Sequence, residues 1–248
     1  IHFIKNLVLV TKIIKYTGNM KLASVIIPYY RKRHHIKKTI KSVLNQSYKN
    51  FEIILVYDDE NMNDLQFLKK NYKKNKKIKI FVNKKNIGAG LSRNRGIELS
   101  KGKYIAFLDA DDEWHKSKLK KQIYYMKKKN ISFTHTSYKI KNEKGFFISN
   151  RKAKDFFNQN DLLKSCDIGL STVIMEKKIY NNNCKFPKNK TKEDFIFWLK
   201  LLKKGHKIYA LKENLATWYK TEKSLSSSTI QKLHDGFNIY YKYMNSTF

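Results

Sequence analysis

Tyr104-Ile-Ala-Phe-Leu-Asp-Ala-Asp-Asp112 is the stretch of sequence that decides the fold. Its first five residues are mostly apolar and predict a buried β-strand, which ends abruptly in three carboxylates within four positions. Crowded carboxylates repel one another and add nothing to stability. Hard divalent cations bind carboxylate oxygens and carry a diphosphate on their other faces. The stretch therefore indicates either a cation site at a strand end or an acidic turn that caps the next helix.

Short strand-like runs alternate with helical runs on the N-terminal side of this stretch. Strands are predicted over 22–28, 51–57, 78–83 and 104–108, and helices over 36–45, 64–75 and 91–99. Continuous apolar runs such as Val25-Ile-Ile27 are typical of strands that are covered on both faces. Repeated strand–helix–strand units predict right-handed crossovers. They indicate an α/β fold with a mostly parallel sheet flanked by helices.

Polar side chains follow three of these strands at the point where each one ends. Tyr29 and Tyr30 follow the first strand, Asp58 and Asp59 the second, and residues 109–112 the fourth. Ligands of doubly wound sheets collect beyond the carboxyl ends of the strands. Core packing does not explain polar groups at three such ends, so a binding site is expected there.

The pattern changes after a predicted helix over 117–129. Two antiparallel strands, 132–138 and 145–149, are expected around a turn at 142–145. They are followed by a strand at 172–175, a helix at 193–202, a strand at 215–219 and a helix at 229–243. We expect one domain overall. Residues 20–130 form its ligand-binding half, and residues 131–248 form a smaller C-terminal lobe with the last helix.

The chain is strongly basic, with 53 Lys and Arg against 20 Asp and Glu and a formal net charge of +33. Only five basic residues are Arg, and the Lys are spread among Asn, Ile, Tyr and Phe, which is typical of an AT-rich coding sequence. A nucleic-acid-binding protein would interleave Arg with aromatic residues on one face, so no nucleic acid partner is expected. The charge is expected to attract anionic lipid headgroups and phosphate-bearing substrates.

The sequence predicts a cytoplasmic protein with possible peripheral contact at the inner face of an anionic membrane. No apolar run approaches the roughly 20 residues that cross a bilayer. Cys166 and Cys184 have neither metal-ligand nor disulfide-framework spacing, which indicates a reducing compartment. Residues 1–19 are broken by Lys5 and Lys12 and precede Met20. We expect them to be a non-native extension or a loose interfacial helix.

In order along the chain, five motifs resemble those of family 2 glycosyltransferases, whose fold is GT-A. The resemblance is strong over about 21–125 and weak to about 230. The motifs are Ser24-Val-Ile-Ile-Pro-Tyr-Tyr30, Ser42-Val-Leu-Asn-Gln-Ser-Tyr48, Phe51-Glu-Ile-Ile-Leu-Val-Tyr-Asp-Asp59, Asn86-Ile-Gly-Ala-Gly-Leu-Ser-Arg-Asn-Arg-Gly96 and Gly102-Lys-Tyr-Ile-Ala-Phe-Leu-Asp-Ala-Asp-Asp112.

The resemblance implies a nucleotide-sugar site at the strand ends. Pro28 and Tyr30 would flank the base, and Asp58 and Asp59 would accept hydrogen bonds from the base or ribose, as an ionised carboxylate can. Gly88, Arg93, Asn94, Asp109 and Ala110 complete the set of expected nucleotide-sugar-binding residues. The family's usual Gly-Ser-x-Asp after the acidic pair is replaced by Glu60-Asn-Met-Asn-Asp64. From the residues alone, Asp58 and Asp59 also fit a helix cap.

Asp109-Ala-Asp111 matches the family's Asp-x-Asp signature. By this resemblance Asp111 is the expected ligand of Mg²⁺ or Mn²⁺, and Asp109 meets the metal or the ribose. Arg93 is expected to lie near Asp109 and to keep that carboxylate ionised. Arg95 is expected to be a solvated neighbour.

Lys192-Glu-Asp-Phe-Ile-Phe-Trp-Leu-Lys200 resembles the family's Glu-Asp…Trp-Leu motif, in which the Asp is the catalytic base. Here that residue is Asp194. Its place at a predicted helix start beside aromatic residues favours a raised pKa. The alternative is that Glu193 and Asp194 only complement the helix dipole.

These expectations describe a metal-dependent inverting glycosyltransferase. It would move one sugar from a nucleotide-sugar, a UDP-sugar by preference, to a hydroxyl of a glycan or lipid-linked acceptor. The chain lacks the Gln-x-x-Arg-Trp motif of processive polysaccharide synthases, so one sugar per encounter is expected. A nucleotidyltransferase is the alternative enzyme, but Tyr29-Tyr-Arg31 lacks the Gly-rich loop expected there. A basic nucleic-acid-binding protein is the alternative outside enzymes.

Overall fold

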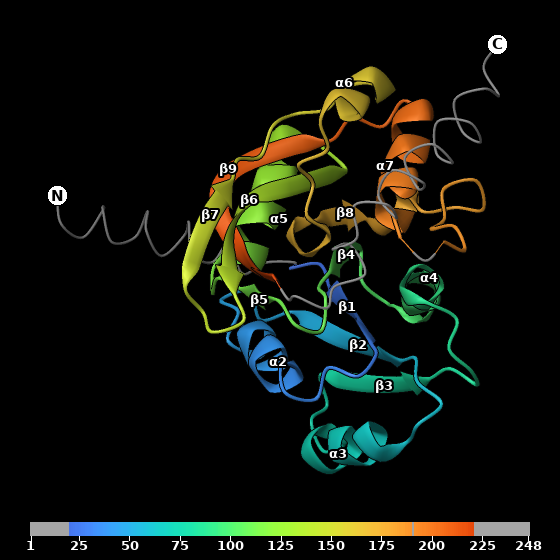
Figure 1. The fold of residues 1–248 in the computed structure, drawn as a ribbon. Coiled ribbons are helices and arrows are strands. Elements are labelled where there is room, and N and C mark those ends of the chain that lie inside the picture. The colour runs from blue at the N-terminus through green and yellow to red at the C-terminus, as the bar shows by residue number, and fades with distance from the viewer. Residues whose placement is uncertain (1–19, 190, 221–248) are drawn as a thin grey trace, which may run out of the picture.

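The computed structural model describes residues 20–189 and 191–220. They form a twisted sheet with helices on both faces, shown in Figure 1. The N-terminal extension 1–19 and the helix predicted over 229–243 lie outside the described residues. No helix among the described residues is long and apolar enough to cross a membrane.

The N-terminal half of the sheet is parallel, as the sequence predicts. Its strands are β1 (Ala23–Tyr29), β2 (Phe51–Tyr57), β3 (Ile78–Val82) and β4 (Tyr104–Phe107), arranged in the order β3-β2-β1-β4. β1 pairs with β2 on one side and with β4 on the other, both in parallel. The carboxyl ends of β2, β1 and β4 therefore lie next to one another.

The C-terminal half continues the same sheet in the order β8-β6-β9-β5. β8 (Ile174–Glu176) pairs antiparallel with β4 and joins the two halves. β6 (Phe133–Asn142) pairs with β8, with β9 (Tyr209–Lys220) and with β7 (Phe147–Arg151). The two-residue β5 (Glu113–Trp114) closes this end against β9.

Two apolar cores cover the two faces of the sheet, because alternate residues of a strand point to opposite faces. Val25 and Ile27 belong to the core that also contains buried residues of α2 (Ile36–Leu44), α3 (Asn63–Tyr72) and α5 (Lys118–Lys129). Ile26 belongs to the other core, with buried residues of α4 (Ala89–Leu99), α6 (Gln159–Lys164) and α7 (Glu193–Lys203). Two short 3₁₀ turns, η1 (Leu170–Thr172) and η2 (Lys177–Ile179), flank β8.

The predicted elements of the parallel half are confirmed with shifts of a few residues at their ends. In the C-terminal half the strand predicted at 172–175 begins two residues later, because 170–172 form the 3₁₀ turn η1. The strand predicted at 215–219 runs from Tyr209 to Lys220. β5 and α6 were not predicted.

Candidate active site

The residues predicted from three strand ends gather at one edge of the parallel sheet. Asp58 and Asp59 follow β2, and Asp109 and Ala110 follow β4, with β1 between them. Pro28 is partly buried in β1, while the Tyr30 side chain just beyond β1 is 44% exposed. The Ala110 carbonyl accepts a hydrogen bond from Thr39 Oγ1 at 2.9 Å, which fixes this edge to α2.

Asp58 is buried and holds the loop that leads into α4. Its carboxylate accepts hydrogen bonds from Asn83 Nδ2 (2.7 Å) and from the backbone N–H groups of Ile87 (2.9 Å) and Gly88 (2.8 Å). Gly88 has φ +86°, a left-handed conformation that suits glycine. These bonds make Asp58 an organiser of the glycine loop, and its contact with a nucleotide stays a prediction.

Asp59 is buried and faces the residues that follow β1. Arg31 donates from Nε to Asp59 Oδ2 at 2.9 Å, and the Asn61 N–H donates to Oδ1 at 3.1 Å. Burial works to raise the pKa of the Asp59 carboxyl, but these bonds outweigh it and hold that pKa below its usual value. The Arg31 guanidinium also lies over the Tyr30 ring, 4.9 Å from its centre. Arg31 thus contacts both the Asp59 carboxylate and the Tyr30 ring, the two groups that were predicted to meet the nucleotide.

Arg93 connects the acidic end of β4 to the start of α7. Its nearly fully buried guanidinium donates to Asp109 Oδ1 at 2.9 Å and to Glu193 Oε1 at 2.6 Å. Burial works to lower the pKa of Arg93, but the two carboxylates outweigh it and raise that pKa. The predicted contact of Arg93 with Asp109 is confirmed. The bridge brings the first turn of α7, with Asp194, toward Asp109.

Asn94, on the same helix as Arg93, holds the segment that precedes α7. Its amide donates to the Phe186 carbonyl at 2.9 Å and accepts from the Phe186 N–H at 3.0 Å. Both polar atoms are therefore bonded to the chain, and the predicted contact of Asn94 with the donor sugar stays a prediction. Arg95 was expected to be solvated, which is wrong. It is half-buried and donates to the Val82 carbonyl at 2.7 Å and to Asn83 Oδ1.

Asp194 lies in the first turn of α7 and faces a cleft. Burial, followed by the neighbouring Glu193 charge, raises the pKa of the Asp194 carboxyl to about 6, against the opposing effect of Arg93. The Phe195 N–H donates to Asp194 Oδ1 at 2.8 Å. A carboxyl with this pKa is ionised at pH 7 and is more basic than an ordinary aspartate. Asp194 therefore has the basicity that a proton acceptor needs, and its role as the catalytic base stays a prediction.

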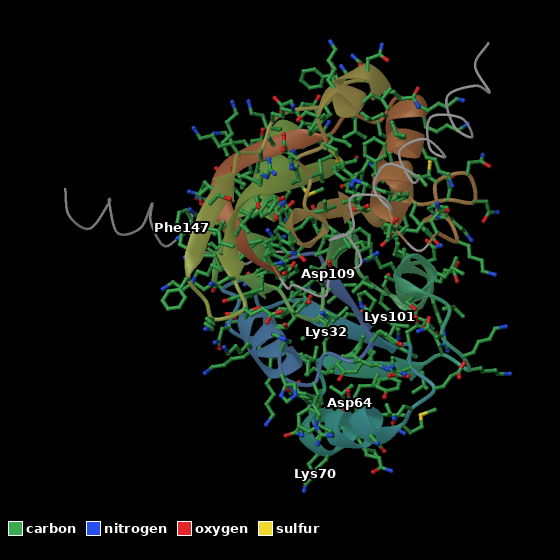
Figure 2. All side chains as sticks on the ribbon, in the orientation of Figure 1. Lys32, Asp64, Lys70, Lys101, Asp109 and Phe147 are labelled. Carbon is green, nitrogen blue, oxygen red and sulfur yellow. The ribbon has the colours of Figure 1, made fainter. Side chains whose placement is uncertain are left out.

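The cleft has a volume of about 260 Å³ and brings residues from both halves of the chain together. Asp109 and Asp112 come from the end of β4, and Asp194 comes from α7. Tyr138 of β6, Trp218 of β9 and residues 169–172 line the remaining wall. Asp109 lies near the middle of the molecule in Figure 2. Asp109 and Asp194 therefore line one cleft, whereas Asp59 and Asp111, which were also expected to converge with Asp194, are not among the residues that line it.

The other two carboxylates of the acidic strand end have different environments. Asp111 Oδ2 forms an ion pair with Lys32 Nζ at 2.6 Å. Asp112 is buried and accepts from Ser171 Oγ at 2.5 Å and from the Tyr219 N–H at 3.3 Å. Burial, with the Asp109 and Asp111 charges nearby, raises the pKa of Asp112 well above its usual value.

A comparison with protein families decides the classification of this chain. The family model described as "Glycosyl transferase family 2" matches residues 24–202, which include all three strand ends and Asp194.

The chain belongs to glycosyl transferase family 2.

This family 2 glycosyltransferase is similar to named bacterial enzymes along most of its length. It is 34% identical over 208 residues to the putative teichuronic acid biosynthesis glycosyltransferase TuaG of Bacillus subtilis. This match covers 84% of this chain and 82% of TuaG. It is 38% identical over 185 residues to the Escherichia coli UDP-Glc:alpha-D-GlcNAc-diphosphoundecaprenol beta-1,3-glucosyltransferase WfgD. This match covers 73% of this chain and 70% of WfgD.

The fold of this glycosyltransferase is GT-A. Its structure is similar to that of S. aureus TarS 1–349 in complex with UDP-GlcNAc, with a TM-score of 0.72 at 21% sequence identity. The likeness covers 89% of this chain and 65% of that TarS chain, and at this identity it shows the fold alone.

Asp109 and Asp111 are the residues of this glycosyltransferase that would hold Mg²⁺ or Mn²⁺. Asp109 and Asp111 offer two carboxylates near the cleft, and among residues 20–189 and 191–220 no cluster of three or more His, Cys, Asp or Glu side chains is arranged to hold a metal. Mg²⁺ typically takes one or two carboxylates and completes its shell with waters and substrate phosphates. Two carboxylates are therefore enough for a cation that also binds the phosphates of a nucleotide, and this cofactor stays a prediction.

Several residues of the site carry no sequence signal that points to them. Ser171 accepts from the Asp109 N–H at 3.1 Å and donates to Asp112, but it stands outside the recognised motifs. Tyr138 and Trp218 reach the cleft only because β6 and β9 pair in this register. Glu193 belongs to the recognised Glu-Asp motif, but its bond to Arg93 is a tertiary contact that the motif does not show.

Proposed function

We propose that this glycosyltransferase moves one sugar, with inversion, from a UDP-sugar to a hydroxyl of a lipid-linked glycan acceptor in the assembly of a surface polysaccharide. Mg²⁺ or Mn²⁺ would act with the donor. The observation that carries this proposal is the shared cleft, in which Asp109 and Asp194 are joined through Arg93 and Glu193.

Asp194 would take the proton of the acceptor hydroxyl. The acceptor oxygen then attacks the anomeric carbon from the face opposite the leaving nucleoside diphosphate, so a single displacement inverts that carbon. A pKa of about 6 lets the carboxyl stay ionised at pH 7 while it accepts a proton more readily than an ordinary aspartate. The Glu193–Arg93–Asp109 bridge holds this base beside the donor end of the cleft.

The donor would lie across the carboxyl ends of β1, β2 and β4. In this proposal Asp59 and Tyr30 would meet the nucleoside, and Asp109 and Asp111 would hold Mg²⁺ or Mn²⁺. When bound, the metal neutralises charge on the two phosphates of the donor. TarS was crystallised with UDP-GlcNAc and with UDP, and WfgD is named for UDP-Glc, which favours a UDP-sugar.

The acceptor would enter past Tyr138 and Trp218. WfgD and WfaP of Escherichia coli are both named for an acceptor attached to diphosphoundecaprenol, and TuaG for teichuronic acid biosynthesis. A lipid-linked acceptor resides in a membrane, so this enzyme is proposed to work at the cytoplasmic membrane face. The formal charge of +33 favours that approach to anionic lipid.

A donor and acceptor assay tests the proposal. UDP-, GDP-, CMP- and dTDP-sugars are screened by thermal shift with Mn²⁺, and the best donor is assayed for transfer to GlcNAc-diphosphate-lipid. Asp194→Asn should lower kcat by about 10²–10⁴-fold and leave the donor's thermal shift unchanged, because only proton abstraction is lost. Glu213→Gln removes a carboxylate from an exposed ion pair with Lys121 and should retain full activity.

Loss of donor binding in Asp194→Asn would show that Asp194 holds the nucleotide-sugar and is not the base. A product that retains the configuration of the donor sugar would exclude the single displacement.

A further inference from the structure

The β6–β7 hairpin exposes three consecutive large apolar side chains at its tip. Phe146 is 66% exposed, Phe147 is 58% exposed and Ile148 is 49% exposed. In Figure 2, Phe147 lies at the left edge of the molecule, well away from Asp109. Contiguous exposed apolar groups of this kind mark a surface that meets another phase or partner. The active site described above makes no use of them.

Hydrogen bonds of the turn, and not packing of these side chains, hold the tip in place. The Asn142 N–H donates to the Phe146 carbonyl at 2.9 Å, and the Gly145 N–H donates to the Asn142 carbonyl at 2.9 Å. Asn142 Oδ1 accepts from the Phe146 N–H at 2.9 Å. Gly145 takes the left-handed φ of +88° that the turn requires. These bonds define the course of the turn while the three apolar side chains stay exposed.

Apolar side chains project from both faces of this hairpin. Phe147 and Ile148 are adjacent in β7, so their side chains point to opposite faces of the strand. Phe146 extends the apolar surface into the turn. A folded protein partner would cover one face and leave the other in water. A fluid apolar medium covers both, so immersion in a lipid interface suits this shape better.

The charges around the tip select an anionic interface. Lys139, Lys141 and Lys144 flank the tip, and Glu143 is the one acidic side chain of residues 139–150. Arg151, Lys152 and Lys154 lie at the other end of β7, where Arg151 pairs with Tyr138. Asp167 pairs with Arg151 and Lys154. Lys139, Lys141 and Lys144 form no salt bridge with any carboxylate in the part of the chain that the structure describes. Basic groups beside exposed aromatic and aliphatic side chains are typical of segments that bind anionic lipid.

The same hairpin extends from the wall of the active-site cleft. Tyr138 lines the cleft, and Asn142 begins the turn four residues later on β6, about 13 Å away at roughly 3.3 Å per residue. Trp218, also in the cleft wall, pairs with Ile140 of β6. A lipid interface that held the tip would therefore lie close to Tyr138 and Trp218, the cleft wall past which the acceptor is proposed to enter.

We infer that the tip Phe146-Phe147-Ile148 inserts into an anionic lipid bilayer, and that Lys139, Lys141 and Lys144 contact the headgroups. This docking surface would place the cleft over a lipid-linked acceptor, an inference that rests on the proposed function. Within residues 20–189 and 191–220, β7 is an edge strand paired only with β6, so a second copy of the chain is the competing occupant. The register shift between Ile140 and Lys141 and the charged end of β7 disfavour such edge pairing.

Vesicle flotation of the full chain tests the inference. Vesicles contain equal parts of phosphatidylglycerol and phosphatidylcholine, or phosphatidylcholine alone. The triple variant Phe146→Ser, Phe147→Ser and Ile148→Ser should bind the anionic vesicles at least about tenfold more weakly than the wild type. Lys139→Gln, Lys141→Gln and Lys144→Gln together should weaken binding to anionic vesicles and leave the weak binding to neutral vesicles unchanged.

Phe157→Ser is the matched control, since Phe157 is 49% exposed and lies before α6, on another part of the surface. It should float like the wild type. The thermal shift by UDP-GlcNAc with Mn²⁺ should be the same in the hairpin variants and in the wild type. A missing shift in every protein would contradict the proposed donor and leave the flotation result intact.

Equal flotation of the triple variant and the wild type would overturn the inference. So would a wild type that does not bind anionic vesicles. The wild type could instead form a dimer in size-exclusion chromatography with light scattering and bind no vesicles. If the triple variant were then monomeric, the tip would be a contact between copies of the chain.

Discussion

Asp194 is the residue whose ionisation should control the rate. Its pKa is raised to about 6 by burial and by Glu193, against Arg93, and Asp109 adds a smaller effect in the same direction. The acceptor proton can be taken only by the ionised form. We expect kcat/KM to fall about tenfold per pH unit below about pH 6. If kcat/KM instead began to fall only at about pH 4, the ordinary aspartate pKa, the cleft would not raise the pKa of this carboxyl.

The same pKa shift predicts the stability of Asp194→Asn. Because the folded-state pKa is above the unfolded one, the shift favours folding below the unfolded pKa of about 4 and this effect is lost as the pH rises to about 6. At pH 7 the buried charge is a cost, so Asp194→Asn should unfold at the same temperature as the wild type or higher. A marked loss of stability at pH 7, measured by calorimetry, would contradict this.

Lys32 forms an ion pair with Asp111, the carboxylate that was expected to bind the metal. Its ammonium lies 2.6 Å from Asp111 Oδ2, and both side chains are partly exposed. A metal at Asp111 must compete with this pair, which at such exposure contributes about 0.2–1 kcal/mol. Lys32→Ala should therefore bind Mn²⁺ about 1.4–5-fold more tightly in the presence of UDP, measured by calorimetric titration. Lys38→Ala removes an exposed charge six residues further along the chain and should leave Mn²⁺ binding unchanged. Weaker Mn²⁺ binding in Lys32→Ala would mean that Lys32 assists the donor.

At the scale of single elements, the packing of α4 on β1 decides whether Arg93 reaches Asp109. Gly96 lies on the face of α4 against the sheet, where an added Cβ would stand 2.4 Å from Ile26 Cγ2. Gly96→Ala would push the helix from β1 and should cost about 1–3 kcal/mol, measured by denaturant unfolding. Ile26→Ala removes the clashing atom, so the double variant should lose less stability than the two single losses added together. Additive losses would show that α4 does not rest on Ile26.

The sequence predicts β1, β2 and β4 well because each is a short apolar run buried on both faces, and β3 is found although most of its residues are only partly buried. It underestimated β9, since only part of that strand is buried, and it missed β5, which has two residues and exists through its pairing with β9. The expectation of a solvated Arg95 was wrong, because its partners at Val82 and Asn83 come from another element. Motif resemblance supplied Asp109 and Asp194, whereas Ser171 and Trp218 depend on tertiary pairing that no local pattern shows.

At the scale of the whole molecule, the two halves of the chain share one sheet. β8 covers the outer edge of β4, and Phe107 of β4 packs against Phe186 with their ring centres 5.4 Å apart. Fragment 20–130 would expose both the strand edge and this apolar surface, so we expect it to be unfolded or aggregated by circular dichroism and light scattering. Fragment 20–220 should fold cooperatively. A monomeric, cooperatively folded 20–130 would show that the nucleotide-binding half is an independent domain.

The convergence of the donor and acceptor groups on one cleft is tested most directly by a crystal structure of the protein with UDP and Mn²⁺. The diphosphate is expected at Asp109 and Asp111, in the same cleft as the Asp194 carboxylate, with Lys32 displaced from Asp111. A nucleotide bound elsewhere, or an Asp194 side chain turned away from the cleft that holds it, would contradict the proposed enzyme mechanism.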